Sequence, residues 1–272
     1  DDWQGEVDHF DRVYCLTKWH REHVMEHYPH VALEKFHLTR NGIDPTRFEP
    51  DLPWLDLMAR KRPRFVWSSS LDRGLDAMLD VWPDILKMRS DATLDVFYGI
   101  ENWRKLNAQN KQGLAVIDFM MARIESMRSE GVTYRDRVGQ AELARAHMDA
   151  LVWASPTAWL ETSCITALEA QAAGAFPVTS KLAALPETVR WGILIPGRNK
   201  SRQYREEFLA GIAFALRGDE KSYSASGNLC SLAGDRTPRQ VAEGNRAWAL
   251  GQTWAAVAQQ WQHEFKDLLD EK

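Results

Sequence analysis

Short apolar runs alternate with longer segments of helical periodicity along the chain from residue 64 onward. The apolar runs have the length of buried strands. They predict strands at residues 65–67, 93–99, 132–134, 151–154, 176–180 and 192–197. The segments between them predict helices at residues 75–89, 101–130, 140–149, 163–174 and 203–216. Strands that alternate with helices predict an α/β fold, with a Rossmann-like parallel sheet and helices on both of its faces.

The chain before residue 64 follows a shorter version of this pattern. It predicts a strand at residues 11–17, a polar helix from Lys18 to His27 and a second strand at residues 36–38. Residues 51–62 have the composition of an irregular connector, so we expect a domain boundary there. The expected division is therefore a remnant of a first domain and its linker over 1–50, an α/β domain over 51–236 that ends in a polar loop from residue 218, and a C-terminal helical segment over 237–272.

The composition is that of an ordinary globular protein, with 44% hydrophobic and 26% charged residues. A formal net charge of -4 argues against a nucleic-acid surface. No apolar run approaches the ~18 residues that a membrane span needs. The three cysteines include no close pair, which disfavours a disulfide framework and favours a reducing compartment. We expect a cytoplasmic protein, with peripheral attachment to the inner face of a membrane as the alternative.

The chain contains twelve tryptophans, a count that invites comparison with carbohydrate-stacking surfaces. Trp67, Trp82 and Trp153 lie in apolar, regularly patterned segments. We therefore expect these three side chains to pack in the core.

Two carboxylates lie eight positions apart around a predicted helix start. Thr162 and Ser163 are good N-cap residues, so the helix is expected to begin near Ser163 and to end at Gly174. Glu161 then lies in the loop ahead of the free N–H groups of the helix, where an anion or polar ligand binds. Glu169 follows about one and a half turns into the helix.

A serine-rich loop with one arginine follows the first strand of the α/β domain. It runs from Ser68 to Gly74 and lies beyond the carboxyl end of the strand, the edge where open α/β sheets bind ligands. The guanidinium of Arg73 can bind phosphate through two parallel hydrogen bonds. We expect an anion at this loop, because a cation at a helix start otherwise opposes the helix dipole.

Five elements occur in order along the chain: Asn41-Gly42-Ile43-Asp44, Arg73-Gly74, Gly99, Val138-Gly139 and the pair Glu161 and Glu169. This set resembles glycosyltransferase family 4 (glycosyl transferases group 1), whose members are retaining enzymes of the GT-B fold with a Glu-x7-Glu signature. The resemblance extends from about Val13 to the end of the chain, but only to the C-terminal, donor-binding half of that family. It implies that most of the N-terminal, acceptor-binding domain is missing.

The resemblance also implies roles for individual residues. Arg73 and Glu161 are the expected catalytic residues, and Glu169 is expected to bind the ribose hydroxyls. The remaining expected donor-binding residues are Ser69, Ser70, Gly74, Gly99, Val138, Gly139, Ser163, Cys164, Ile165 and Thr166. Ser69 or Ser70 takes the place of an arginine in the family, and Arg73 takes the place of a lysine. Family chemistry implies neither a metal nor a cofactor.

The implied reaction is the transfer of a sugar from a nucleotide-diphosphate sugar to an acceptor, which is an unidentified glycan, lipid or protein. We expect this chain alone to bind the donor and to transfer little. Two alternatives remain: a nucleotide-sugar-binding module without catalysis, and a nucleotide-sugar epimerase of GT-B architecture. The thiol of Cys164 lies at the expected helix start, but no histidine nearby in sequence could serve as its base, which disfavours a nucleophilic role.

Overall fold

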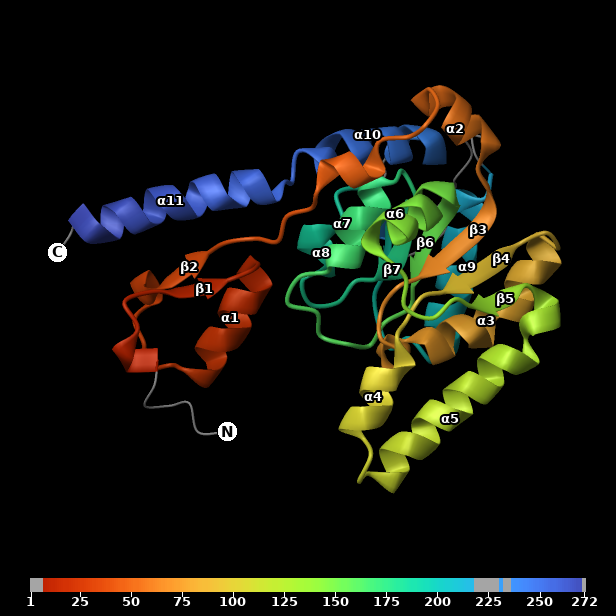
Figure 1. The fold of residues 1–272 in the computed structure, drawn as a ribbon, viewed down its shortest axis with the longest axis horizontal. Coiled ribbons are helices and arrows are strands. Elements are labelled where there is room, and N and C mark those ends of the chain that lie inside the picture. The colour runs from red at the N-terminus through yellow and green to blue at the C-terminus, as the bar shows by residue number, and fades with distance from the viewer. Residues whose placement is uncertain (1–6, 218–229, 232–235, 271–272) are drawn as a thin grey trace.

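The computed structural model describes residues 7–217, 230–231 and 236–270. Its largest part is an α/β domain built on a seven-stranded sheet in the order β5-β4-β3-β6-β7-β8-β9 (Figure 1). The strands are β3 (Arg62–Trp67), β4 (Thr93–Val96), β5 (Val132–Tyr134), β6 (Ala150–Ser155), β7 (Phe176–Ser180), β8 (Ile193–Ile195) and β9 (Cys230–Ser231). Strands β3 to β8 pair in parallel, which confirms the predicted sheet, and β9 adds an antiparallel edge.

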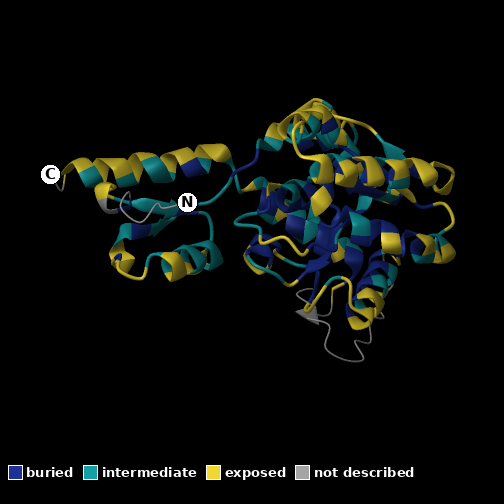
Figure 2. Ribbon diagram, turned by 90° about the horizontal axis from the view of Figure 1, so that it is seen from below, coloured by how far each residue is buried: buried dark blue, intermediate teal, exposed yellow. Residues whose placement is uncertain are grey.

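Helices cover both faces of this sheet, as the sequence pattern predicts (Figure 1). One face carries α3 (Leu75–Met88), α5 (Lys111–Ser126) and α9 (Arg202–Ala215). The other face carries α6 (Gln140–Asp149) and α7 (Ile165–Ala172), with α10 (Pro238–Leu250) packed against α7. The buried residues lie in the middle layer, between the sheet and its helices (Figure 2).

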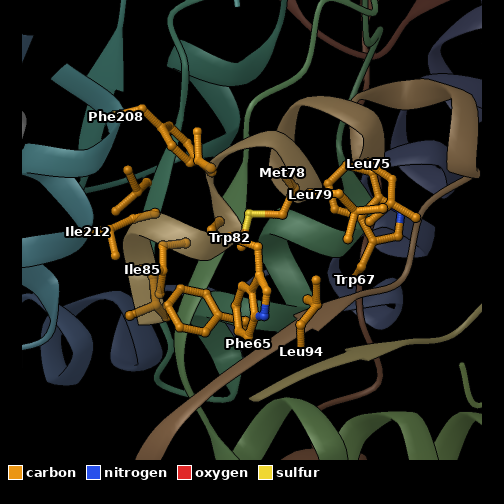
Figure 3. Close-up of a cluster of buried hydrophobic side chains, with 14 of the residues drawn as sticks. Phe65, Trp67, Leu75, Met78, Leu79, Trp82, Ile85, Leu94, Phe208 and Ile212 are labelled. Atoms are coloured by element: carbon orange, nitrogen blue, oxygen red, sulfur yellow. The ribbon is translucent and has the colours of Figure 1, made fainter. Parts of the chain in front are cut away.

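Successive residues of β3 supply both of these cores. Phe65 lies in the large cluster on the α3 side, whereas Val66 lies in a second cluster beside α6. Figure 3 shows Phe65, Leu94 and the Trp82 indole meeting in the large cluster. The rings of Phe65 and Trp82 contact edge to face at 5.5 Å between centroids, and the Trp82 Nε1–H donates to the Glu130 carbonyl. Trp67, Trp82 and Trp153 are all buried, so the core prediction is confirmed.

Several element boundaries differ from the sequence prediction. The expected connector at 51–62 contains a helix, α2 (Trp54–Arg60), whose Trp54 ring packs against Gly174 and the Arg246 guanidinium. The expected helix at 101–130 is divided into α4 (Ile100–Leu106) and α5, because Asn110 caps a new helix start by accepting from the Gly113 N–H at 3.1 Å. The short helix α8 (Leu185–Thr188) lies between β7 and β8, where no helix was predicted.

The expected polar loop at 218–236 falls mostly outside the described residues, apart from β9. Helix α3 runs without interruption through Pro83, a residue type that usually breaks or kinks a helix. The C-terminal segment, predicted to be helical over 237–272, forms two helices, α10 and α11 (Trp254–Asp270), with a break at residues 251–253.

The first residues form a small separate unit beside the α/β domain (Figure 1). Strands β1 (Val13–Cys15) and β2 (Phe36–Leu38) pair in parallel, and α1 (Lys18–His27) connects them. Helix α11 packs on this unit. Its Trp261 ring stacks on Tyr14 at 4.9 Å between centroids, and its Trp261 Nε1–H donates to the Thr39 hydroxyl at 2.7 Å.

The linker at Asn41-Gly42 has no regular secondary structure. An Asn-Gly pair favours a turn because both residues tolerate a positive φ, but Gly42 has no positive φ. A Cβ at Gly42 would lie 2.4 Å from the Trp254 nitrogen, and the Ile43 N–H donates to the Gln252 carbonyl at 2.8 Å. Glycine is required here because two chain segments cross in close contact.

Candidate functional site

Parallel pairing of β3 and β6 brings two loops together at the carboxyl edge of the sheet. The Arg73 Nη1 donates to the Glu161 Oε1 at 2.9 Å, so the two expected catalytic residues form a direct ion pair. The side chain of Glu161 is only 13% exposed, which strengthens this pair relative to one in open solvent. The guanidinium of Arg73 also lies over the ring of Trp159, 5.0 Å from its centroid.

Gly74 holds the two loops at their closest approach. Its φ is +114°, and a Cβ added to it would lie 2.6 Å from the Pro156 carbonyl oxygen. Both the backbone conformation and the missing space therefore favour glycine. The position predicted as part of a phosphate-binding loop is thus fixed by contact with the loop that carries Glu161.

Helix α7 begins at Ile165, two residues later than predicted, with Cys164 as its N-cap residue. The Glu161 carbonyl accepts from the Ala184 N–H at 3.2 Å, and the Thr162 carbonyl accepts from the Thr17 hydroxyl at 3.0 Å. These two carbonyls are held by bonds to other segments, which leaves the loop before Cys164 in a non-helical conformation. The predicted N-cap role of Thr162 and Ser163 is therefore wrong, although Ile165 and Thr166 do lie at the helix start.

Glu169 lies on α7, half-buried and one turn beyond the helix start. Burial raises the pKa of its carboxyl group, and the positive charge of Arg47 opposes this rise. A carboxyl group placed this way can accept hydrogen bonds from hydroxyl groups, or donate one to them when it is protonated.

Two cations that the sequence analysis missed hold the other end of α7. The Lys61 Nζ donates to the carbonyls of Ala173 at 2.8 Å and Gly174 at 3.1 Å, and the Arg246 guanidinium donates to the Ala172 carbonyl. Positive charge at a helix C-terminus is favourable because the carbonyl groups there are partly negative. No local pattern indicates these contacts, since they join residues 74 to 113 positions apart.

A cavity of about 360 Å³ lies beside the carboxyl end of β4. Gly99 and Val138, two of the expected donor-binding residues, line it together. A Cβ at Gly99 would lie 3.0 Å from the Arg137 Cβ, so a side chain there would narrow the cavity. Gly139 is not among the lining residues, and nothing lies within 4 Å of where its Cβ would be. The cavity is lined by Phe97, Tyr98, Gly99, Asn102, Asp136, Arg137, Val138, Gln140 and Leu143.

The serine-rich loop is held by its neighbours. The Ser69 carbonyl accepts from the Trp67 Nε1–H at 2.8 Å, and the Ser70 hydroxyl donates to the Tyr98 hydroxyl at 3.3 Å. The Ser68 hydroxyl lies 3.0 Å from the His147 Nε2. The predicted donor-binding positions Ser69 and Ser70 therefore lie between Arg73 and the residues of the cavity.

His147 is a buried histidine that the sequence analysis did not single out. Burial first, and then the positive charge of Lys61, lower its pKa to about 4. In the unfolded chain the imidazole takes up a proton near pH 6.5, whereas in the folded chain it stays neutral until about pH 4. The unfolded state therefore binds more protons between these values, and the folded state loses stability as the pH falls.

We expect the free energy of unfolding to drop by about 2–3 kcal/mol more in the wild type than in His147→Gln between pH 6.5 and pH 4.5. Urea denaturation at a series of pH values measures this difference. The carboxylates titrate alike in both proteins, so the difference between the two pH profiles reports the titration of His147 alone. Parallel pH profiles for the two proteins would show that His147 does not titrate as described.

A second cavity, of about 200 Å³, lies between the small N-terminal unit and the α/β domain. Ser163 and Arg40 are among the residues that line it. Next to it, the Glu187 carboxylate accepts from the N–H groups of Lys18 at 2.9 Å and Trp19 at 2.8 Å. A carboxylate at the start of α1 is favourable, because the helix N-terminus is partly positive. These bonds join the two units beside the loop of Glu161.

The Cys164 thiol is buried, 3.2 Å from the Thr166 hydroxyl. Burial raises its pKa to about 11, so the thiol is protonated at neutral pH and unsuited to nucleophilic attack. Within the described part of the chain, no three His, Cys, Asp or Glu side chains gather where they could hold a metal ion. The helices described here also include none with the length and apolar character needed to cross a membrane.

Comparison by sequence finds no matching protein-family model and no matching curated protein. Comparison by structure finds glycosyltransferases. A glycosyltransferase from Rickettsia africae matches with a TM-score of 0.69 at 11% identity, over 99% of this chain and 66% of its own. Sucrose-phosphate synthase from Thermosynechococcus elongatus matches with a TM-score of 0.68 at 16% identity, over 98% of this chain and 61% of its own.

HepE from Anabaena, solved in complex with UDP and glucose, matches with a TM-score of 0.68 at 12% identity, over 94% of this chain and 63% of its own. The chain spans 61 to 66% of the length of these three structures. The fold is therefore that of the Rossmann-like domains of GT-B glycosyltransferases.

Proposed function

We propose that the chain is the donor-binding half of a retaining glycosyltransferase of family 4, which transfers a sugar from a nucleotide-diphosphate sugar to an acceptor. One observation carries the proposal: Arg73 and Glu161 converge at the start of α7, on the carboxyl edge of a parallel sheet. The structural likeness to HepE, solved with UDP and with UDP-glucose, supports the nucleotide sugar as donor.

The charge that develops in the reaction assigns the roles. Transfer breaks the bond between the sugar and the diphosphate, so negative charge grows on the leaving diphosphate and positive charge on the sugar ring. The N–H groups at the start of α7 stabilise the diphosphate as fixed donors that need no rearrangement, and the Arg73 guanidinium adds a positive charge. Glu161 orients the sugar, and the Glu169 carboxylate accepts hydrogen bonds from the ribose hydroxyls. This mechanism uses no metal ion.

The ion pair between Arg73 and Glu161 prepares both groups for the donor. A diphosphate carries more negative charge than one carboxylate, so it competes with Glu161 for the Arg73 guanidinium. Once Arg73 turns to the phosphate, the Glu161 carboxylate is free to accept from the sugar hydroxyls. The pair therefore keeps a half-buried cation and a carboxylate neutralised until the donor enters.

Calorimetric titration of the chain tests the proposal. We expect UDP or GDP to bind, and to bind at least about tenfold more tightly than the corresponding nucleoside, because only the diphosphate reaches Arg73 and the start of α7. The nucleoside serves as the control for binding in the 360 Å³ cavity alone. The absence of heat with both nucleoside diphosphates would contradict the proposal.

A nucleotide-sugar-binding module without catalysis is the second candidate. It is favoured by the loop at Ser69 and Ser70, where the family has an arginine. This chain has two serines there, of which the Ser69 carbonyl and the Ser70 hydroxyl are bonded to its own residues. With Arg73 as the cation at this loop, the leaving diphosphate is less fully neutralised than in the family. Donor hydrolysis without acceptor separates the candidates, since a binding module leaves the donor intact.

A further inference from the structure

One exposed tryptophan lies directly beside the proposed donor site. Trp159 is 47% exposed, in contrast to the buried tryptophans of the core. It lies two residues before Glu161 and contacts Arg73 through its ring. Leu160 and Ile165, which flank the same loop, are also exposed. An apolar surface therefore borders the place where the donor sugar is expected.

The backbone around Trp159 is fixed on both sides. The Trp159 N–H donates to the Thr157 hydroxyl at 2.9 Å, and the Trp159 carbonyl accepts from the Glu161 N–H at 3.1 Å. Thr157 is itself buried, and its carbonyl accepts from the Ser180 hydroxyl at 2.6 Å. A large side chain on a backbone held in this way loses little freedom when a ligand binds to it.

The indole has both an apolar surface and an unused polar group. The Arg73 guanidinium covers one part of the ring. Among the residues that the structure describes, none forms a hydrogen bond with the Trp159 Nε1–H. A pyranose ring matches both features, since it offers a face of C–H groups to the indole and hydroxyl acceptors to the Nε1–H at its edge. A hydrocarbon chain would leave the Nε1–H without a partner.

We propose that Trp159 is a stacking platform for a pyranose ring of the acceptor, a role that rests on the proposed glycosyl transfer. The acceptor is thereby a carbohydrate, held with one ring face on Trp159 and its hydroxyls near Glu161. The cation–π contact couples this platform to the donor, because the Arg73 that binds the diphosphate also orients the indole.

Saturation-transfer NMR tests the platform with four methyl pyranosides as probes: the α-glucoside, α-mannoside, α-galactoside and N-acetylglucosaminide, each with and without UDP. We expect at least one to show saturation at its ring C–H protons. Trp159→Ala should weaken that binding by about tenfold, as the loss of an aromatic contact implies, whereas Trp159→Phe should keep it within about threefold. Trp254→Ala is the matched control, because Trp254 is 48% exposed and lies at the start of α11.

Three results would overturn the platform: no pyranoside binds the wild type, Trp159→Ala binds as tightly as the wild type, or Trp254→Ala loses binding equally. If an alkyl glucoside binds where the methyl glucoside does not, the surface takes a hydrocarbon chain and the carbohydrate assignment is wrong. The proposed donor is tested separately. If pyranoside binding depends on Trp159 but UDP does not bind, the nucleotide-sugar donor is contradicted and the platform is supported.

Discussion

An Arg73→Ala variant is expected to bind UDP about 10- to 100-fold more weakly than the wild-type chain. The guanidinium supplies charge-assisted hydrogen bonds to the diphosphate, and each such bond contributes about 1.5–3 kcal/mol. The substitution also leaves the Glu161 carboxylate, only 13% exposed, without its partner and next to the incoming phosphate. Repulsion between these two anions adds to the loss. Calorimetric titration measures the change.

Arg128→Ala is the matched control, because Arg128 forms an ion pair with Glu125 on the exposed surface of the domain. It should bind UDP as the wild type does. In any form of the protein that performs transfer, Arg73→Ala and Glu161→Ala should each lower the rate ~10²-fold or more. If Arg73→Ala keeps its thermal stability and binds UDP as tightly as the wild type, Arg73 is not part of the donor site.

A Gly74→Ala variant is expected to lose about 2–4 kcal/mol of folding free energy. Alanine is strained at a φ of +114°, and its Cβ would lie 2.6 Å from the Pro156 carbonyl oxygen. The loop of Arg73 and the loop of Glu161 would have to separate to relieve this contact. We therefore expect the melting temperature to fall by about 5–10 °C, and UDP binding to weaken as well.

Gly139→Ala is the control for Gly74→Ala. Gly139 has a φ of −67°, and nothing lies within 4 Å of a Cβ placed there. The same substitution should therefore leave the melting temperature within about 2 °C of the wild type. Equal destabilisation by both variants would mean that the effect is not the steric contact between the two loops.

The parallel sheet could be predicted because its strands are short apolar runs and its helices are separate amphipathic segments. Residues 65–67 and 152–154 are all buried, on both faces of the sheet, and this burial appears in the sequence as continuous apolar runs. The pairing of Arg73 with Glu161 follows from the same topology, since both residues come after neighbouring parallel strands. The sequence pattern is therefore sufficient to predict the site where the sheet alone positions the residues.

The remaining differences arise where distant segments decide the local structure. Helix α7 begins at Ile165 rather than Ser163 because Thr17 and Ala184 hold the two preceding carbonyls. Gly42 permits a chain crossing, whereas its neighbour Asn41 suggests a turn. The cations at the C-terminus of α7 come from residues 61 and 246. Contacts of this kind leave no periodicity in the sequence, so single-sequence reasoning cannot find them.

The most direct test of the account is a crystal structure of the chain with UDP bound. We expect the diphosphate between the Arg73 guanidinium and the N–H groups at the start of α7, the ribose hydroxyls at the Glu169 carboxylate and the base in the cavity of Gly99 and Val138. The Arg73–Glu161 bond, 2.9 Å without ligand, should be lengthened or broken. A diphosphate bound elsewhere, with the Arg73–Glu161 pair intact, would contradict the proposed donor site.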